Sequence, residues 1–361
     1  MDSTDSKKIR IAFLGDLHLG SRRVTLEDDL LTLLHGCDHV VVNLEGPICE
    51  PSLNHLPKAP ILRSDPGTET VLKDWHITCA TLANNHIFDY GLDGFRNTCQ
   101  VLQEQQIFFA GAGKNINDAS RPLILDCNGY HVGIIPCTES ITGAVIATED
   151  TAGCNDLQFP QIVDQILKMK ALVDVVIVTP HWDFLDYTYP SPTVISTGRR
   201  LFDGGADIII GHHSHVAQGV CQEDDGREVI YSLGNFYFET YESNGRIFDA
   251  SDEIWDGIIT IVELQSNRKP QTWPVYIRQS NGIVNVDNSK KREIQWRKRS
   301  APLKLGEKYA GFWRRVTFLR LLRRICYWLH PSKWWHIRRA TLRAGFITIT
   351  QSSRILSRKA K

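Results

Sequence analysis

The chain has 361 residues, of which 42% are hydrophobic and 23% charged, the composition of an ordinary globular protein. No run approaches eighteen consecutive apolar residues, which excludes a conventional transmembrane helix, and nine Cys without a CxxC pair predict reduced thiols. The net charge of zero conceals a division, because residues 290–361 hold 21 Lys or Arg against two acidic residues, a net of +19. The first 289 residues then hold 20 basic and 39 acidic residues, a net of −19, so we expect an acidic body and a basic extension with different partners.

The predicted elements alternate between strands and helices through the first two thirds of the chain. Residues 1–10 are polar and lead directly into the first strand, without an apolar signal region, so we expect a cytoplasmic location. This alternation predicts an α/β domain with largely parallel strands. Strands are expected at 11–14, 40–42, 77–83, 175–178 and 208–210, and helices at 26–35, 92–106, 162–172 and around 197–202.

The later apolar segments lack helices between them. Residues 229–231, 257–264 and 273–277 are therefore expected to be antiparallel strands that close a sheet. A domain boundary is expected where the strand pattern stops and the basic excess begins. We predict a body at 1–285 and an extension at 286–361.

Polar side chains follow the first two predicted strands at the point where each strand ends. Asp16 and His18 are two residues apart, so an extended backbone places both on one face, where they can bind one cation. Asn43 and Glu45 repeat this arrangement after the second strand, and a carboxylate there could bridge two metal ions. Taken alone, the first pair is better explained as a capping Asp and a loop His, whereas the second pair is equally consistent with capping residues.

The next two clusters add an amide and two imidazoles. Asn85 and His86 follow a buried run and precede Asp89, and an Asn carbonyl oxygen is a neutral metal ligand. A His beside it that stays off the metal can donate a proton to a leaving group, so His86 and Asp89 are our candidate catalytic residues. His181 ends a later strand beside Trp182, an aromatic residue expected to wall the site.

The segment Gly211-His212-His213-Ser214-His215 is the most specific of the motifs. Three His in four residues are hard to explain by packing, because each buried imidazole needs a polar partner. His213 and His215 alternate to one face and are predicted ligands, whereas His212 is expected to be structural or to support a ligand. Asn235 is expected to orient one of the metal-bound His residues.

Taken together, these clusters predict one centre for two divalent metal ions. Mixed oxygen and nitrogen ligation suits Mn, Fe or Zn, and a pair of such ions is typical of enzymes that hydrolyse phosphoesters. A loop at 51–66, rich in Pro, connects strand ends near this centre and is expected to shape its pocket.

The order of the clusters resembles that of the calcineurin-like metallophosphoesterases. More narrowly, the motifs at 43–45, 82–91, 181–182, 211–218 and 231–236 resemble the CapA family of capsule and poly-γ-glutamate synthesis proteins. The resemblance implies a four-layer αββα sandwich. It also implies that Asp16, His18 and His215 hold one metal, that Asn85, His181 and His213 hold the other, and that His86 acts as acid or charge clamp.

The resemblance leaves the bridging carboxylate open and shows two departures. The superfamily uses an Asp where this chain offers Asn43 or Glu45, and Glu45 is preferred because a bridge needs negative charge. Many CapA relatives lack a His at the position of His18. The family also commonly shows Gly where this chain has Asp183, a carboxylate that could tune or obstruct the second metal.

The basic extension is predicted to contain an amphipathic helix. Its apolar face comprises Phe312, Val316, Leu319, Leu322, Ile325 and Leu329, with Arg residues around it and Trp313, Trp328, Trp334 and Trp335 as interface-seeking aromatics. This pattern predicts a helix on an anionic membrane surface. The alternatives are a helix docked on the acidic body and, ranked lower because no nucleic-acid module accompanies it, a segment that binds nucleic acid.

The leading functional hypothesis is a metal-dependent phosphoesterase of capsule, exopolysaccharide or poly-γ-glutamate synthesis, peripheral on the inner face of the cell membrane. Its expected partners are a phosphoester substrate or polymer intermediate, the membrane surface and a polymer-synthesis complex. The alternative is a non-catalytic accessory or scaffold subunit of a polymer synthase or export complex.

Overall fold

The computed structural model describes residues 8–21, 24–239, 241–243, 246–248, 256–266 and 268–329. The chain divides into two compact units, Met1–Gly306 and Glu307–Lys361. Each unit is described by itself below.

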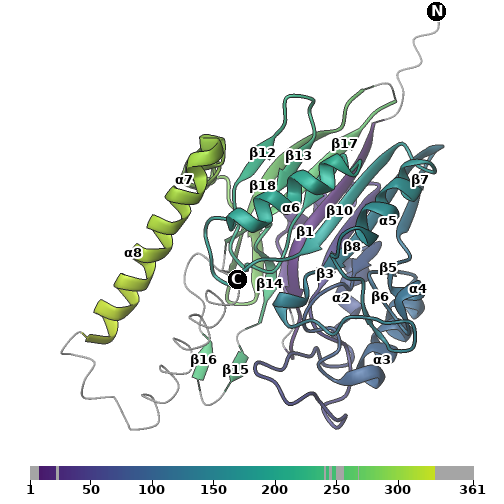
Figure 1. Ribbon diagram of the computed structural model, residues 1–361. Coiled ribbons are helices and arrows are strands. Elements are labelled where there is room, and N and C mark those ends of the chain that lie inside the picture. Colours follow the sequence, from purple (N-terminus) through teal and green to yellow (C-terminus); the bar gives the residue numbers. More distant parts are fainter. Residues whose placement is uncertain are drawn as a thin grey trace, which may run out of the picture. The chain divides into compact units, whose positions relative to one another are not determined.

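A nine-stranded sheet forms one half of the first unit (Figure 1). Its strands are β1 (Ile9–His18), β2 (Thr25–Leu26), β3 (His39–Leu44), β4 (Cys79–Thr81), β5 (Phe108–Ala110), β14 (Asn235–Phe238), β17 (Asp256–Leu264), β18 (Gln271–Ser280) and β19 (Ile283–Val286). β3, β4, β5 and β14 continue a parallel arrangement with β1, whereas β17 and β18 join it antiparallel. The predicted antiparallel strands at 257–264 and 273–277 are thereby confirmed.

A six-stranded sheet forms the other half. Its strands are β7 (Leu123–Cys127), β8 (Tyr130–Thr138), β10 (Val175–His181), β11 (Ile208–Ile210), β12 (Val220–Gln222) and β13 (Glu228–Ile230). The prediction of an antiparallel strand at 229–231 is wrong for the main pairing, because β13 runs parallel to β11 and antiparallel only to the edge strand β12. The turn from β12 into β13 reverses the chain, so parallel pairing needs no helix there.

Helices of the first unit cover the outer faces of both sheets, and the second unit contributes one further helix to the described chain. The helices are α1 (Asp28–His35), α2 (Thr70–Asp74), α3 (Gly91–Glu104), α4 (Ile116–Ala119), α5 (Gln161–Lys170), α6 (Pro192–Asp203), α7 (Lys290–Ser300) and α8 (Tyr309–Leu329), with 3-10 turns at Ser140–Thr142 and Ala301–Lys308. Two small ribbons pair β6 (Ala112–Gly113) with β9 (Gly153–Cys154) and β15 (Tyr241–Ser243) with β16 (Arg246–Phe248).

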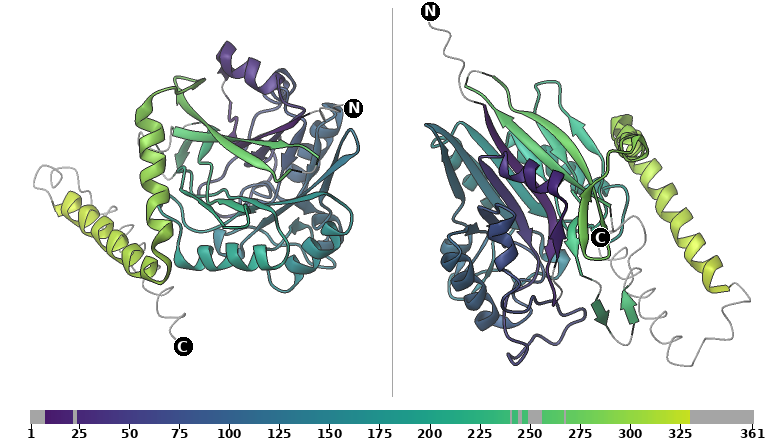
Figure 2. Two further views of the ribbon diagram at one scale, coloured as in Figure 1. Left: turned by 90° about the horizontal axis from the view of Figure 1, so that it is seen from above. Right: turned by 180° about the vertical axis from the view of Figure 1, so that it is seen from behind.

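Alternation along the central strands produces the layers. In β1, Ile11 and Phe13 face the second sheet and share a core with Ile177 of β10, whereas Ala12 and Leu14 face outward into a core shared with α1 and α3. On the far side, α5 packs on β8 and β10. The views from above and behind show the same order of helices and sheets (Figure 2). The four-layer αββα sandwich is therefore confirmed.

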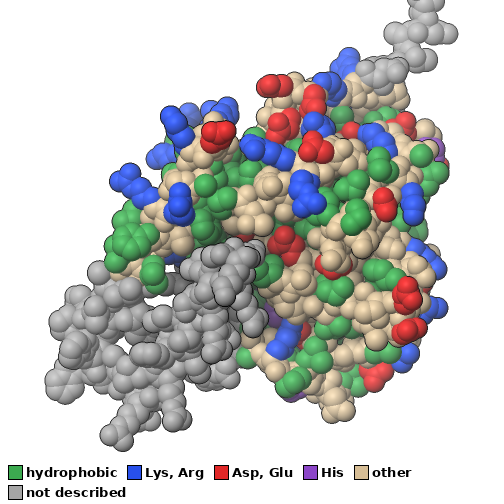
Figure 3. Space-filling view, viewed as in Figure 1, with side chains coloured by type: hydrophobic (Ala, Val, Ile, Leu, Met, Phe, Trp, Pro, Cys, Tyr) green, Lys and Arg blue, Asp and Glu red, His purple; other side chains and the backbone are tan. Residues whose placement is uncertain are grey.

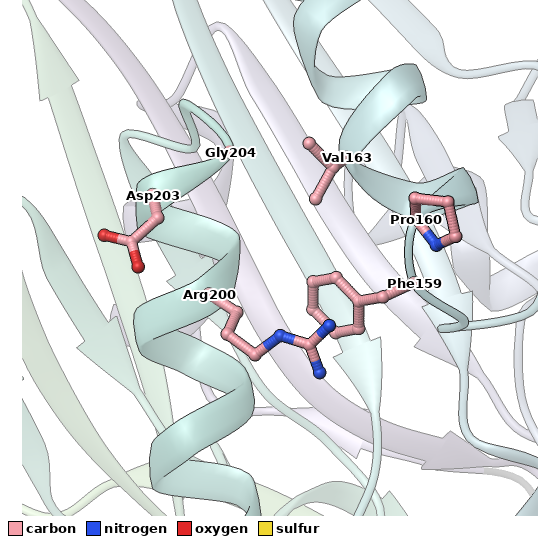
Figure 4. A pocket seen from close by; sticks show the side chains of 6 residues that line it. All are labelled: Phe159, Pro160, Val163, Arg200, Asp203 and Gly204. Atoms are coloured by element: carbon pink, nitrogen blue, oxygen red, sulfur yellow. The ribbon is translucent and has the colours of Figure 1, made fainter.

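A shallow hollow of about 500 Å³ lies on the outer helix layer between α5 and α6 (Figure 4). The guanidinium of Arg200 lies over the ring of Phe159, 3.6 Å from its centroid. None of the residues that line this hollow is a predicted ligand or catalytic residue. The lining residues are Phe159, Pro160, Val163, Arg200, Asp203 and Gly204.

The extension begins with α7, which belongs to the first unit, and α8 belongs to the second. Lys and Arg side chains gather over α7 in the space-filling view (Figure 3). In α8 the exposed apolar side chains include Phe318, Leu319, Leu321 and Leu322. At 100° per residue they cover nearly half of the helix circumference, and Leu319 and Leu322 belong to the predicted apolar face.

Trp334 and Trp335 lie outside the described residues, as do the side chains of Ile325, Trp328 and Leu329. No helix within the described part of the chain is long and apolar enough to cross a membrane. The domain boundary at 285/286 stays a prediction.

Candidate metal centre

The predicted strand-end residues meet at one edge of the sandwich because the central strands of both sheets are parallel. Asp16 lies two residues before the end of β1, opposite Asn43 of β3, while His181 ends β10 and bridges to His212 in the loop after β11. The carboxyl ends of parallel strands share one edge of a sheet, so each loop delivers its side chains there. Asp16, Glu45 and His181 each offer a ligand atom within 4.8 Å of the others.

Asp16 is a fully buried acceptor at the middle of this cluster. Its Oδ1 accepts a hydrogen bond from Asn43 Nδ2 at 2.8 Å and lies 3.1 Å from His212 Nδ1, while Oδ2 lies 3.3 Å from His215 Nδ1. Burial opposes ionisation, but the hydrogen bonds from His212 and His215 hold the pKa of Asp16 well below its usual range. Asp16 is therefore a carboxylate at neutral pH.

The three residues expected to hold the second metal lie in direct contact. His181 Nε2 is 2.9 Å from Asn85 Oδ1 and 2.9 Å from His213 Nδ1. Burial lowers the pKa of His181 well below its usual range and that of His213 to about 3, so both rings are neutral. Neutral imidazoles and an amide oxygen are metal ligands, and adjacent ligands about 2.1 Å from an ion lie about 3 Å apart.

Glu45 lies between the two groups of predicted ligands. It is fully buried, and neither carboxylate oxygen has a hydrogen-bond partner among the described residues. Burial raises its pKa to about 8, while Glu45 and Asp16, against the effect of burial, raise the pKa of His215 to about 10. Its Oε1 lies 3.7 Å from His215 Nε2 and 3.9 Å from His86 Nε2.

Both polar atoms of the Asn43 side chain, the other candidate bridging ligand, already have hydrogen-bond partners. Its amide nitrogen donates to Asp16, and its oxygen accepts from Asn84 Nδ2 at 3.3 Å and from Thr81 Oγ1 at 3.4 Å. A buried carboxylate with free oxygens is the better bridging ligand, which favours Glu45 over Asn43.

His18 lies apart from the contacts that surround Asp16. The pairing of β1 shifts register between Asp16 and Leu17, so the regular alternation assumed from the sequence is interrupted. His18 Nε2 lies 3.0 Å from the carbonyl oxygen of Arg63, while its Nδ1 is buried without a partner. Burial lowers its pKa to about 4, so the ring offers Nδ1 as a neutral ligand.

His86 and Asp89, the predicted catalytic pair, are joined by a short contact. His86 Nδ1 lies 2.7 Å from Asp89 Oδ2, which also accepts from the backbone N–H of Leu62 at 2.8 Å. Burial lowers the pKa of His86, although the hydrogen bond to Asp89 opposes this shift. The ring is thereby oriented with Nε2 toward the side of the centre where Glu45 lies.

The loop at 51–66 contributes to the centre, as expected, through groups that the sequence did not single out. Lys58 Nζ lies 2.5 Å from Asp89 Oδ1 and 2.5 Å from the carbonyl oxygen of Asn85. Arg63 and Leu62 supply the backbone contacts to His18 and Asp89. Lys58 is one of two basic residues in this loop, and that was the only available signal.

Two of the predicted supporting residues contact candidate ligands, and a third packs elsewhere. His212 contacts Asp16, and Asn235 Oδ1 lies 2.8 Å from His215 Nδ1, as expected of residues that orient ligands. Trp182 does not wall the site: it is fully buried and donates to the carbonyl oxygen of Tyr231 at 2.9 Å.

Asp183 occupies a position where the resemblance led us to expect Gly. Its φ of 72° lies in the left-handed region that favours Gly and is tolerated by Asp. Its carboxylate accepts from the backbone N–H of Ser191 at 2.7 Å, at the start of α6. This contact directs the carboxylate to a helix terminus.

The buried polar atoms fit a cation better than a hydrogen-bond network. His181 Nε2 is either a donor with one proton for two acceptors, or an acceptor from His213 Nδ1 that then faces Asn85 Oδ1 lone pair to lone pair. Glu45 and His18 Nδ1 remain unsatisfied at the same edge of the sandwich. The donor set therefore fits divalent metal ions.

Comparison with known proteins places the candidate site residues within one family match. The family model described as bacterial capsule synthesis protein PGA_cap matches residues 10–240, which include every candidate site residue. The chain is 29% identical over 251 residues to the capsule biosynthesis protein CapA of Bacillus anthracis, covering 65% of this chain and 61% of the relative. It is 28% identical over 239 residues to the PGA biosynthesis protein CapA of Bacillus subtilis (strain 168), covering 63% of each.

The chain thus spans about three fifths of the length of these curated relatives. Among solved structures, the calcineurin-like phosphoesterase YfkN of Bacillus subtilis is 17% identical, with a TM-score of 0.38. That comparison covers 78% of this chain and 88% of the YfkN chain.

Proposed function

Because the chain belongs to the PGA_cap family of bacterial capsule synthesis proteins, we propose that it is a metal-dependent phosphoesterase acting in the synthesis of a capsule polymer or poly-γ-glutamate. The observation that carries the proposal is Glu45, a fully buried carboxylate without hydrogen-bond partners beside Asp16 and His181. A buried carboxylate is costly unless it is paired with a cation.

The proposed ligands divide into two groups that share Glu45. Asp16, His215 and, through its free Nδ1, His18 hold one ion. The residues already in contact, Asn85, His181 and His213, hold the other. Bound there, two ions would supply an activated water nucleophile and neutralise charge on the phosphoryl group.

The chain's own residues supply the proton for the leaving group. His86 presents Nε2 toward the centre and is held through Nδ1 by Asp89. After uptake of a proton at Nε2 from solvent, the imidazolium would pass that proton to the departing oxygen and return to the neutral ring that burial favours. Lys58 stabilises the charge of Asp89 from the loop side. This arrangement keeps the ring orientation fixed while the proton moves at Nε2.

The test compares hydrolysis of an alkyl phosphodiester and an alkyl phosphomonoester, whose alkoxide leaving groups need a proton, by Mn²⁺-loaded wild type and a His86→Ala variant. Removal of a general acid costs about 10²–10⁴-fold in rate. His131→Ala, an exposed His on β8, is the matched control. The proposal fails if the wild type hydrolyses neither ester faster than His86→Ala at equal metal content.

The same variant addresses the accessory or scaffold alternative. Polymer production that is unaffected by His86→Ala in a producing cell would favour a non-catalytic role over hydrolysis. Loss of polymer with a normal amount of protein would favour catalysis.

We place the enzyme on the inner surface of the cell membrane through its basic extension. The support is α8, where Arg314 and Arg315 are exposed close to the exposed side chains of Phe318, Leu319 and Leu322. Basic residues beside apolar ones attract a helix to anionic lipid surfaces.

A further inference from the structure

α7 lies outside the family match, which ends at residue 240. It nevertheless packs beside β12, the strand that follows the loop carrying His213 and His215. Figures 1 and 2 show it along the side of the sandwich. A helix that is merely part of a basic tail would present only exposed charges. Two of its side chains instead reach the backbone of that loop.

The carboxyl-terminal half of α7 contacts three consecutive parts of the loop exit. Trp296 Nε1 donates to the carbonyl oxygen of Gln218 at 2.7 Å, and the Arg299 guanidinium donates to that of Ala217. The hydroxyl of Ser300 accepts from the backbone N–H of Val220 at 3.0 Å. Arg299 is only 5% exposed, so its charge is committed to this contact and not to solvent.

The backbone between these contacts allows the close approach. A Cβ at Gly219 would lie 2.6 Å from the carbonyl oxygen of Arg299, closer than real Cβ atoms approach other atoms. The loop exit and the end of α7 therefore pack backbone to backbone.

The amino-terminal half of α7 is tied to the neighbouring segment. Arg292 forms ion pairs with Asp256 at the start of β17 and with Asp287. The next residue, Gly257, packs against Asn235, since a Cβ at Gly257 would lie 2.0 Å from the Asn235 carbonyl oxygen. Asn235 is the residue that contacts His215 Nδ1 at 2.8 Å, so α7 supports His215 from two directions.

The loop needs such support because two of its residues adopt unfavourable backbone conformations. His213 has a φ of 91° and His215 a φ of 56°, the left-handed region that non-glycine residues rarely adopt. Such conformations persist only where surrounding contacts fix them. Gln218 also donates from its backbone N–H to Ser232 O at 2.9 Å, and α7 completes the restraint through the carbonyl oxygens of residues 217 and 218.

We propose that α7 is a positioning element of the metal centre and that Trp296 and Arg299 are positioning residues for His213 and His215. The inference rests on the proposed metal centre and adds that ligation geometry depends on a helix beyond the family domain. It further implies that the first helix of the basic extension helps to fix the backbone of the loop that carries the ligands.

The experiment uses full-length Trp296→Phe and Arg299→Gln variants. Phe keeps an aromatic ring against Tyr276, whose ring centroid lies 5.9 Å from that of Trp296, but it removes the N–H donor. The matched control is Arg297→Gln, in the same helix, where the Arg is exposed and pairs only with Glu293 among the interactions described. Co²⁺ is titrated into each metal-free protein, and its visible absorption reports ligand geometry and affinity.

We expect about tenfold weaker Co²⁺ binding and altered absorption bands in both variants, as when residues that orient metal ligands are lost. Arg299→Lys, which keeps a cationic donor, should recover part of the affinity. Hydrogen exchange of the metal-free proteins gives a second measurement: amides of 211–218 should exchange faster in Trp296→Phe than in Arg297→Gln, while those of β8 and β10 stay unchanged.

The two proposals fail in different ways. If wild type and variants bind Co²⁺ equally and the 211–218 amides exchange as in Arg297→Gln, α7 is not a positioning element. If the wild type itself binds no Co²⁺, the metal centre is wrong, and hydrogen exchange alone then decides whether α7 holds the loop. If Arg299→Gln fails to fold, Trp296→Phe decides.

Discussion

Glu45 is the residue on which the dinuclear interpretation depends most. Its carboxylate is fully buried without a hydrogen-bond partner, and burial raises its pKa to about 8. An isolated protein without metal therefore carries the cost of an unsatisfied buried acid, and a bound cation would remove it.

This cost predicts that Glu45→Gln raises the stability of the metal-free protein but lowers the stabilisation that Mn²⁺ provides. Glu45→Gln should stabilise the metal-free protein by about 1 kcal/mol, because an amide is neutral at every pH and less costly to bury. It should also abolish most of the increase in melting temperature that Mn²⁺ gives to the wild type. Thermal unfolding with and without Mn²⁺ measures both effects.

Glu104→Gln serves as the control, since this α3 residue is exposed and contacts Gln100. It should leave the Mn²⁺ response intact. A Glu45→Gln protein that is destabilised without metal and still responds to Mn²⁺ would contradict the proposed role.

At this scale the sequence predicted the cluster well, because each ligand type follows an apolar strand and parallel strands share an edge. It could not find Lys58, since a single Lys in a loop rich in Pro has no periodic pattern to mark its direction. It also misjudged Trp182, whose neighbour His181 faces the site while Trp182 packs into the core. Alternation along the strand separates the two.

At the scale of elements, α7 shows how a charge count can hide a structural role. Its many Lys and Arg residues assigned it to a basic tail, but Arg292 and Arg299 are turned toward the body. Sequence alone cannot distinguish a buried Arg from an exposed one in a helix that is polar on most sides.

The parallel pairing of β13 with β11 also escaped prediction. A loop and an edge strand connect the two strands here, in place of the crossover helix that usually indicates parallel pairing.

The attachment of α7 should depend on pH through Asp256. Burial raises the pKa of Asp256 to about 6, and Arg292 only partly offsets this shift. Between about pH 4, near the ordinary pKa of Asp, and pH 6 the folded state binds a proton that the unfolded state lacks. The stability contributed by this group therefore falls as pH rises through that window and is constant above it.

Protonation of Asp256 between pH 6.5 and 4.5 stabilises the folded wild type. Asp256→Asn lacks this titrating group, so its free energy of unfolding should gain less, or fall more, over the same change in pH. Urea unfolding at the two pH values measures the difference. Asp93→Asn, at an exposed position in α3, should follow the wild type. An Asp256→Asn profile parallel to the wild type would contradict the assignment.

At the scale of the whole molecule, the division between an acidic body and a basic extension separates two tasks. The body carries every candidate ligand within the family match, whereas residues 290–361 of the extension carry the net charge of +19. The described part of α8 offers both Arg and exposed apolar side chains, and Leu319 and Leu322 lie on the predicted apolar face.

We predict that the full chain co-floats with vesicles containing anionic lipid and much less with neutral vesicles. Each Arg near such a surface contributes about 1 kcal/mol, so Arg314→Gln with Arg315→Gln should weaken binding about 25-fold. Arg96→Gln with Arg121→Gln, on the body, should not. Equal flotation with neutral and anionic vesicles would exclude the membrane role.

The central claim is that the strand-end cluster holds two metal ions that share Glu45. The most direct measurement is the metal content of the chain after equilibration with Mn²⁺ and removal of free ions, determined by mass spectrometry of the metal. We predict two ions per chain in the wild type and fewer than one in Glu45→Gln. Wild type without retained metal, or a Glu45→Gln variant that retains two ions, would contradict it.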